Sequence, residues 1–398
     1  MRFVPAAITP LQFKDIFKAL LIPIKGNGIE EFEHEIASYF CAKKAFSFTS
    51  LMRTNYACLF SLGKFDRRRE VILPRYSCPS FVHAILAAGL KVKYCDVNPE
   101  TLSYKTELLF QIASSDTLAI ICPNLFGLTN PIDSIMEFCR ANNIFLIEGV
   151  DYGIGTEYKG RRIGTFGDFT ILNFQEGKAI PVGGGMFTTN NENIISFFEK
   201  DRKKNISNIL LMLAYSTLSR PHMYYIFMKI TKWLNLNRKQ FSMEDTIRKT
   251  NQEFDFNFDS DSYDNSLSNF QGALGSIVLS KLEIHIETRA LNASILETQL
   301  SNIRGLQLIK KETGVNKVHY IRYPVLIERN KKDKVLQQLL ERGIEASPMY
   351  IEHGMNISSD EYPGAERVAN ELLTLPCHPY TNEKDIEVII DTIRSICN

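Results

Sequence analysis

Short β-rich runs alternate with helical patterns from about Phe46 to Thr189, and this alternation limits the chain to a small set of folds. It is typical of βαβ units around a mostly parallel sheet. In open sheets of this kind, ligands bind at the carboxyl ends of the strands. We therefore predict an α/β domain with its site at that edge. The predicted strands are Ala45 to Thr49, Glu70 to Leu73, Val92 to Asp96, Leu118 to Cys122, Ile144 to Glu148, Phe169 to Phe174 and Gly185 to Thr189.

Unusual polar or glycine-bearing stretches follow several of these predicted strands. Because the carboxyl ends of parallel strands meet at one edge of a sheet, these stretches are expected to lie together. They are Ser50 to Thr54, Arg75 to Ser80, Pro123 to Gly127 and Gly149 to Gly155.

Lys178 is the candidate catalytic residue. It ends the segment NFQEGK (173–178), and the triple glycine 183–185 follows it ahead of a strand-like run. A lysine amine becomes a nucleophile only when it is partly desolvated or near another cation, and a mostly apolar strand end with a glycine turn supplies such a place. The glycines allow close backbone approach. The alternative is a solvated surface charge, as most lysines are.

The composition is that of an ordinary soluble protein. With 398 residues, 44% hydrophobic and 23% charged, the chain is expected to form two domains. A net charge of +1 makes nucleic acid an unexpected partner. The eight cysteines show no C-x-x-C pair or metal-like spacing, so we expect no metal, reduced thiols and a cytoplasmic location.

Two apolar helical patterns, broken at Ser219-Arg220-Pro221, form an insertion at about 205–234. Each half is too short to span a bilayer. We favour a buried or dimer-facing helical hairpin. The alternative is an interfacial helix peripheral to the inner membrane, since Lys229, Lys232 and Trp233 suit a headgroup boundary.

The last third of the chain predicts a smaller α+β domain. A polar loop, Asp255 to Asn265, precedes one long amphipathic helix from Ser266 to Gln299. We divide the chain into a large domain, 1–255, and a small domain, 256–398. The remaining predicted elements are a strand from Val318 to Ile327 and helices from Asp333 to Arg342 and from Lys384 to Ile396.

From about Gly26 to its end, the chain resembles the DegT/DnrJ/EryC1/StrS group of sugar aminotransferases. The order and spacing of several short motifs carry this resemblance, and details such as the apolar insertion indicate a divergent branch. The motifs are Gly28 to Glu33, Val71 to Pro74, Gly89 with Asp96 and Thr101, Glu148 to Gly164, the Lys178 segment, and Glu371 to Pro379.

The resemblance implies a homodimer of fold type I that uses pyridoxal 5'-phosphate (PLP), with a mostly parallel seven-stranded sheet. Lys178 would bond to the cofactor aldehyde and then shuttle a proton between the amino donor and the cofactor. Relatives commonly take the amine from glutamate or glutamine and give it to a keto carbon of a nucleotide-linked sugar. A histidine at the lysine position marks the deoxygenating relatives, so Lys178 argues against that subgroup.

The chain departs from the family after the strand Ile144 to Ile147. Relatives read Glu-Asp-Ala-Ala there, and the aspartate keeps the pyridine nitrogen of the cofactor protonated. This chain reads Glu148-Gly149-Val150-Asp151. In an extended strand Asp151 would lie about 7 Å from position 149, too far for the same hydrogen bond unless a bulge or an altered exit angle at Gly149 brings it in. The alternative is a solvated or helix-capping Asp151.

The other candidate site residues come from the same resemblance. Arg53 and Thr54 lie in the expected phosphate cradle at a helix start, where Arg53 is alternatively a surface charge. Cys78 falls at the place of the ring-stacking aromatic, Tyr152 replaces a glutamine or histidine, and Asn173 offers a hydrogen bond to phosphate. On the substrate side the candidates are His353 and Tyr350, the latter alternatively a core residue.

Three hypotheses follow. The first is a PLP-dependent aminotransferase acting on a keto sugar in polysaccharide or secondary-metabolite biosynthesis. The second, motivated by the clustering of Gly149, Cys78 and the altered cradle at one site, is a protein with altered PLP chemistry or a non-catalytic partner in a surface-glycan assembly. The third places the enzyme at a membrane through the insertion at 205–234.

Overall fold

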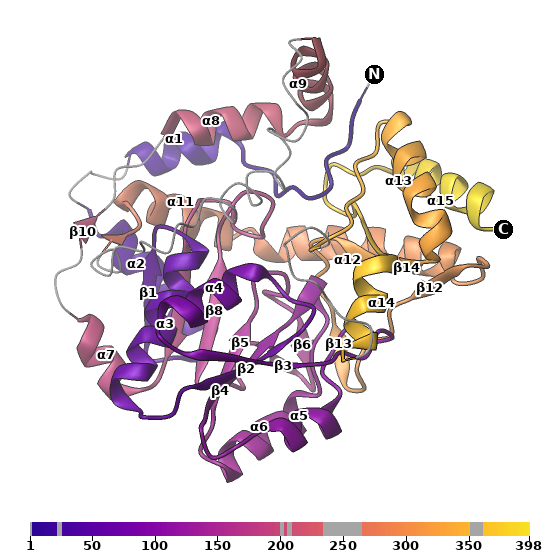
Figure 1. Cartoon of the computed structure of the whole chain (residues 1–398). Coiled ribbons are helices and arrows are strands. Elements are labelled where there is room, and N and C mark those ends of the chain that lie inside the picture. Colours follow the sequence, from indigo (N-terminus) through magenta and orange to yellow (C-terminus); the bar gives the residue numbers. More distant parts are fainter. Residues whose placement is uncertain (1, 22–25, 200–202, 205–208, 234–264, 351–360) are drawn as a thin grey trace.

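The computed structural model describes residues 2–21, 26–199, 203–204, 209–233, 265–350 and 361–398. Its largest sheet has seven strands in the order β1-β9-β8-β5-β4-β2-β3. Only β9 runs antiparallel to its neighbours, so the predicted mostly parallel α/β sheet is confirmed (Figure 1). The strands are β1 Lys44–Phe48, β2 Glu70–Pro74, β3 Lys91–Cys95, β4 Thr117–Pro123, β5 Phe145–Gly149, β8 Phe169–Asn173 and β9 Gly185–Thr189.

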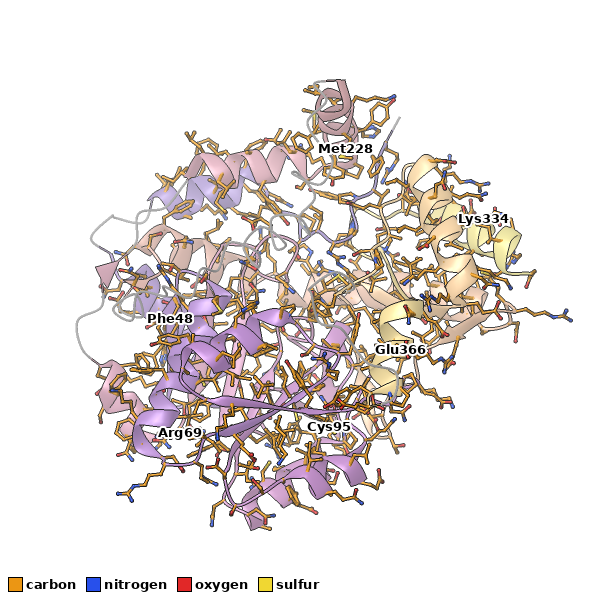
Figure 2. All side chains as sticks on the ribbon, viewed as in Figure 1. Phe48, Arg69, Cys95, Met228, Lys334 and Glu366 are labelled. Carbon is orange, nitrogen blue, oxygen red and sulfur yellow. The ribbon has the colours of Figure 1, made fainter. Side chains whose placement is uncertain are left out.

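Helices cover both faces of this sheet, which explains its nearly continuous apolar strands. All seven residues of β4, TLAIICP, are buried. Such runs are typical of strands enclosed on both sides. One apolar cluster, which includes Phe48 (Figure 2), joins the sheet to α3, α4 and α7, and the other joins it to α2, α5, α6 and α11 (Asn269–Leu279). The bounds are α2 Gly28–Tyr39, α3 Leu51–Phe65, α4 Pro79–Ala87, α5 Thr106–Ile112, α6 Ile132–Ala141 and α7 Glu192–Phe198.

The long helix predicted from Ser266 to Gln299 is wrong, because two helices occupy this range. These are α11 (Asn269–Leu279), which begins at a Ser268 capping box, and α12 (Leu282–Leu300). Helix α11 follows α2 so closely that a Cβ on Gly272 would lie 2.2 Å from the carbonyl oxygen of Gly28. The chain turns at Ser280-Lys281. After this turn, α12 runs toward the C-terminal sheet rather than along α2.

The C-terminal part contains an antiparallel sheet, β12-β14-β15, next to α13, α14 and α15. The strand predicted from Val318 to Ile327 is correct only for its second half. Residues His319 to Arg322 are buried but form an irregular connection that leads into β14. The two predicted helices are confirmed. The elements are β12 Leu306–Leu308, β14 Tyr323–Ile327, β15 Leu372–Leu375, α13 Arg329–Glu341, α14 Pro363–Glu371 and α15 Glu383–Cys397.

The remaining elements are short. A 3-10 turn, η1, spans Leu125–Gly127, and two small sheets complete the fold. They contain β6 Glu157–Tyr158, β7 Arg161–Arg162 and β13 Val315–Lys317 in one, and β10 Lys203–Lys204 and β11 Asn265–Ser266 in the other.

The insertion forms two helices, α8 (Ile209–Leu218) and α9 (Pro221–Trp233), with the predicted break between them. Helix α8 lies beside α1 (Phe13–Leu21) (Figure 1). The hairpin is not buried within one chain, because Leu210 is 77% exposed. Within the described ranges, no helix is long and apolar enough to cross a membrane.

The domain division at residues 255 and 256 stays a prediction, because these residues and most of the predicted 255–265 loop lie outside the described residues. Helix α11, which the division assigns to the small domain, packs on α2 of the large one.

Candidate active site

Lys178 lies in the loop between β8 and β9, at the carboxyl edge of the sheet. Its side chain is buried, and its Nζ lies 3.1 Å from Oδ2 of Asp151. The same nitrogen lies 3.3 Å from the centre of the Tyr152 ring. Three of the predicted site residues are therefore in direct contact, and Asp151 is neither solvated nor a helix cap.

The surroundings of Lys178 act on its pKa in opposite directions. Burial lowers the pKa of the amine, but Tyr152 and Asp151 attract the ammonium form, and the pKa is held above its ordinary value. The free amine is therefore held in its ammonium form. Asp151, in hydrogen-bonding contact, is one of the two partners that stabilise this form.

The glycine turn after Lys178 allows the close approach predicted from the sequence. Gly184 has a φ of +79°, and a Cβ there would lie 2.4 Å from the Phe48 carbonyl oxygen. A Cβ on Gly185 would lie 2.6 Å from Oγ1 of Thr54. The turn thus brings β9 against the first turn of α3, which a larger side chain would prevent.

The first turn of α3 carries the predicted phosphate residues. Ser50 caps the helix by accepting the backbone N–H of Arg53 at 3.2 Å, and the Arg53 guanidinium donates to Thr49 Oγ1 at 2.6 Å. The hydroxyl of the buried Thr54 donates to the Ser50 carbonyl at 2.9 Å. Helix N-termini attract phosphate, but the roles of Arg53 and Thr54 stay predictions.

Asn173 ends β8 and shapes the turn that leads to Lys178. Its Oδ1 accepts the backbone N–H of Gln175 at 2.9 Å. Asn173 and Asp151 also line one small void together with apolar side chains. The structure therefore brings Asn173 next to the lysine pair, and its contact with phosphate stays a prediction.

Tyrosines from both parts of the chain meet above Lys178. The Tyr350 hydroxyl donates to the Tyr152 hydroxyl at 3.4 Å, and the Tyr350 ring packs against Tyr76, with ring centres 5.6 Å apart. Tyr350 also has a φ of +59°, which is uncommon for a residue other than glycine and is often found at functional sites. His353 lies outside the described residues.

Cys78 lies close enough to Asp151 and Lys178 for both charges to act on its thiol. Burial raises the pKa of the thiol, and its Sγ lies 3.1 Å from Oγ of Ser80. A protonated thiol is a poor nucleophile, so the geometry favours Cys78 as a packing residue beside the site.

Gly149, the last residue of β5, lies where the family aspartate was expected. A Cβ on Gly149 would lie 3.3 Å from the tip of the Phe81 ring and 3.4 Å from the Cα of Pro123. An aspartate at this position would therefore press on the Phe81 ring, which would have to shift slightly to admit it. No β-bulge is recorded in the pairing of β5 with its neighbours, and Asp151 reaches the site from the turn after the strand.

Glu148, next to Gly149 in β5, holds the loop that leads into β8. The buried carboxylate accepts the backbone N–H groups of Gly164, Phe166 and Gly167 at 2.7 to 2.8 Å. This contact fixes the loop that returns to β8, so Glu148 is a structural residue of the site.

Two buried polar side chains at the same edge fit a bound polar group. Both amide atoms of Asn124, after β4, and the Oγ of Ser77, after β2, are buried and have no hydrogen-bond partner in the described part of the chain. Unpaired buried groups are costly and usually await a partner. With the buried amine of Lys178, they fit a phosphorylated aldehyde cofactor. Their segments were singled out in the sequence, but these residues were not.

Sequence reasoning missed the network behind Lys178. The Thr9 hydroxyl donates to the Lys178 carbonyl at 2.7 Å and accepts from the fully buried Arg289 at 2.7 Å. The Tyr215 hydroxyl of α8 lies 3.3 Å from the Thr9 carbonyl oxygen. These residues come from three distant segments, so no local pattern could have linked them.

A buried lysine in contact with a carboxylate and a tyrosine, at the carboxyl edge of a mostly parallel sheet, is typical of enzymes that bind an aldehyde cofactor through a lysine. The model of the DegT/DnrJ/EryC1/StrS aminotransferase family matches residues 13–208 and 234–394. The chain therefore belongs to this family, and the family and enzyme class predicted from the sequence are confirmed.

Several relatives have known activities or structures. A dTDP-4-dehydro-2,3,6-trideoxy-D-glucose 4-aminotransferase from Saccharopolyspora spinosa is 27% identical over 330 residues, which cover 82% of this chain and 77% of that protein. Helicobacter pylori PseC, an aminotransferase involved in the biosynthesis of pseudoaminic acid, has a TM-score of 0.76 at 17% identity and covers 100% of this chain and 99% of its own.

An E. coli GDP-4-keto-6-deoxy-D-mannose-3-dehydratase, solved with bound hydrated PLP, has a TM-score of 0.75 at 21% identity over 100% of both chains. These solved structures confirm the fold predicted from the sequence. PLP, the cofactor predicted from the sequence, is the cofactor of this family, whose members include nucleotide-sugar aminotransferases and dehydratases.

Proposed function

We propose that this protein is a PLP-dependent aminotransferase that moves an amino group from glutamate or glutamine to the keto carbon of a nucleotide-linked sugar, in the cytoplasm and as a homodimer. The observation that carries the proposal is the buried Lys178 amine in contact with Asp151 and Tyr152. The family of the chain and the activities of its relatives support the reaction class.

In this proposal each residue of the site has its own role in the reaction. Lys178 supplies the amine that holds the cofactor and afterwards carries the proton, while Asp151 positions the amine and stabilises its ammonium form before the cofactor binds. The first turn of α3, with Arg53 and Thr54, and the unpaired Ser77 and Asn124 are the candidates for binding polar groups of the cofactor. When bound, PLP supplies the electron sink for proton removal. Tyr350 with Tyr152 closes the substrate side.

A second candidate function rests on Gly149. Without a carboxylate at that position, the cofactor ring would lack its usual partner and would be a weaker electron sink, which suits altered PLP chemistry or a non-catalytic role in a glycan assembly. The retained and buried Lys178 favours catalysis of some kind.

The test is conversion of glutamate to 2-oxoglutarate by the purified protein, saturated with PLP, in the presence of nucleotide-linked 4-keto sugars. We expect turnover that is lost in Lys178→Ala. A sugar that stays unaminated with every donor, despite cofactor bound to Lys178, would favour the second candidate.

A further inference from the structure

Helices α1, α8 and α9 form an exposed surface with many large apolar side chains. The most exposed are Leu21 at 83%, Leu210 at 77% and Phe17 at 60%, with Leu211, Ile226 and Ile230 about half exposed. We propose that this α1–α8–α9 surface binds the headgroup region of an anionic lipid bilayer, which would make the protein a peripheral membrane enzyme.

Helix α1 is apolar on both of its faces. Its inner face, with Ile16 and Ala19, is buried, as packing on α11 requires. Phe13, Phe17 and Leu21 follow one another at intervals of four residues and lie on the outer face. An outer apolar stripe is not explained by the folding of this chain, because its side chains remain exposed.

Helix α8 extends the apolar surface. It contains no charged residue, and it lies beside α1 (Figure 1). The Arg220 guanidinium, just after α8, lies 5.4 Å from the centre of the Phe13 ring at the start of α1. The two helices therefore run in opposite directions, which brings Leu210 toward the end of α1 that carries Leu21.

The charges of the surface identify the occupant. Lys14, Lys18, Arg220 and Lys229 are exposed, whereas the one acidic residue in these three helices, Asp15, is buried and paired with Lys281. The whole chain has a net charge of only +1, so these cations are a local concentration. Exposed apolar side chains among cations suit an anionic lipid surface.

The same charges argue against a second copy of the chain as the occupant. A two-fold dimer places the same patch of both subunits together, so the lysines and arginine of one surface would face those of the other. Like charges at such an interface repel.

The geometry suits binding at the surface of a bilayer rather than insertion across it. Helix α9, which carries Met228, contacts Phe3 and Glu345 through its first turns and projects from the rest of the protein (Figure 2). Interfacial helices bury their apolar side chains by about 5 to 10 Å. On its opposite side, α8 places the Tyr215 hydroxyl on Thr9, directly behind the Lys178 loop. A bound membrane would therefore lie next to the support of the active site.

Flotation of the full-length protein with two kinds of vesicle tests the proposal. One kind contains phosphatidylcholine alone, and the other contains phosphatidylcholine mixed with phosphatidylglycerol. We expect binding to the mixed vesicles that weakens as salt is raised, and little binding to phosphatidylcholine alone. Equal recovery in the soluble fraction with both vesicles would overturn the proposal.

Two variants and a control locate the contact. The double change Phe17→Ser with Leu210→Ser should weaken partitioning at least about tenfold. Lys14→Glu with Lys18→Glu should weaken it about fivefold or more for each cation lost, without touching the core. Leu291→Ser changes a leucine that is 62% exposed on α12, outside this surface, and should partition like wild type.

Light scattering on the same proteins distinguishes membrane binding from the other explanation, an interface between two copies of the chain. The proposal expects an unchanged molar mass in every variant, with only vesicle binding lost. If Phe17→Ser with Leu210→Ser instead reduces the molar mass, and the wild type does not float, the surface is an interface between copies and the proposal is wrong. Unchanged melting temperatures show that the variants fold.

Discussion

Lys178 Nζ and Asp151 Oδ2 form a buried ion pair, 3.1 Å apart, with side chains that are 8% and 12% exposed. The carboxylate comes from the turn after β5, two residues beyond the strand end at Gly149. In this structure Asp151 therefore acts on the lysine amine itself, and this contact decides the protonation state of the residue on which the proposed reaction depends.

Replacing Asp151 by asparagine should make Lys178 reactive at lower pH. The carboxylate helps to raise the pKa of the ammonium group, so its removal lowers that pKa and frees the amine earlier as pH increases. The measurement is the rate at which lysine-bound cofactor absorption appears after PLP is added at different pH values. Asp133→Asn, which breaks the surface pair with Lys159, serves as control. An unchanged pH midpoint in Asp151→Asn would contradict the role of the pair.

An aspartate at position 149 should destabilise the protein. Its Cβ would lie 3.3 Å from the Phe81 ring, which would have to shift, and overpacking of this kind costs about 1 to 3 kcal/mol in the free energy of unfolding. Urea unfolding should show that Phe81→Leu recovers part of this loss in the double variant. Wild-type stability of Gly149→Asp alone would mean that Phe81 does not occupy the place of the missing carboxylate.

Thr9→Val should loosen the lysine loop. The change removes the donor to the Lys178 carbonyl and leaves the buried Arg289 without one acceptor, at an expected cost of about 2 to 3 kcal/mol in stability. Thr9→Ser keeps the hydroxyl and should restore both stability and PLP retention on dialysis. If valine and serine behave alike, the hydroxyl contributes nothing to the position of Lys178.

Stability should fall as the pH decreases, partly because of His378. Its Nε2 donates to the Pro5 carbonyl at 2.7 Å and its Nδ1 accepts the Tyr380 N–H at 3.2 Å, which fixes the neutral ring. Burial lowers its pKa to about 3 in the folded protein. Only the unfolded state then binds the proton below about pH 6.5, so the native state loses about 1.4 kcal/mol per pH unit.

His378→Gln tests this linkage, because glutamine does not titrate. Urea unfolding at several pH values should give a shallower dependence in the variant between about pH 6.5 and pH 4. Parallel curves for variant and wild type would show that His378 does not supply this proton.

The sequence predicted the seven strands and the sheet edge of the site because their signals are local. Buried strands such as β4 appear as apolar runs, and the glycine turn after Lys178 marks a close backbone approach. The break between α11 and α12 could not be predicted, because Ser280 and Lys281, where the first helix ends, are neither glycine nor proline.

The site was predicted less completely than the fold. Asp151, Tyr152 and Lys178 were predicted as site residues. The role considered for Asp151 was contact with the cofactor ring, and its contact with the lysine amine, which the turn after Gly149 allows, was not predicted. The network of Thr9, Arg289 and Tyr215 depends on contacts between segments more than 160 residues apart in sequence, which no spacing rule can supply. For the hairpin at 205–234 the sequence favoured a buried or dimer-facing position over an interfacial membrane helix. The exposed Leu210 excludes burial within one chain, and the dimer-facing position stays a prediction that the vesicle and light-scattering experiments test.

Trapping the cofactor on the protein tests the central claim most directly. The purified protein is incubated with PLP, reduced with borohydride, digested and analysed by mass spectrometry. We predict one pyridoxyl-modified peptide, with the modification on Lys178, and its loss in Lys178→Ala while other lysines stay unmodified. Modification spread over surface lysines, or none at Lys178 after saturation with PLP, would contradict the account.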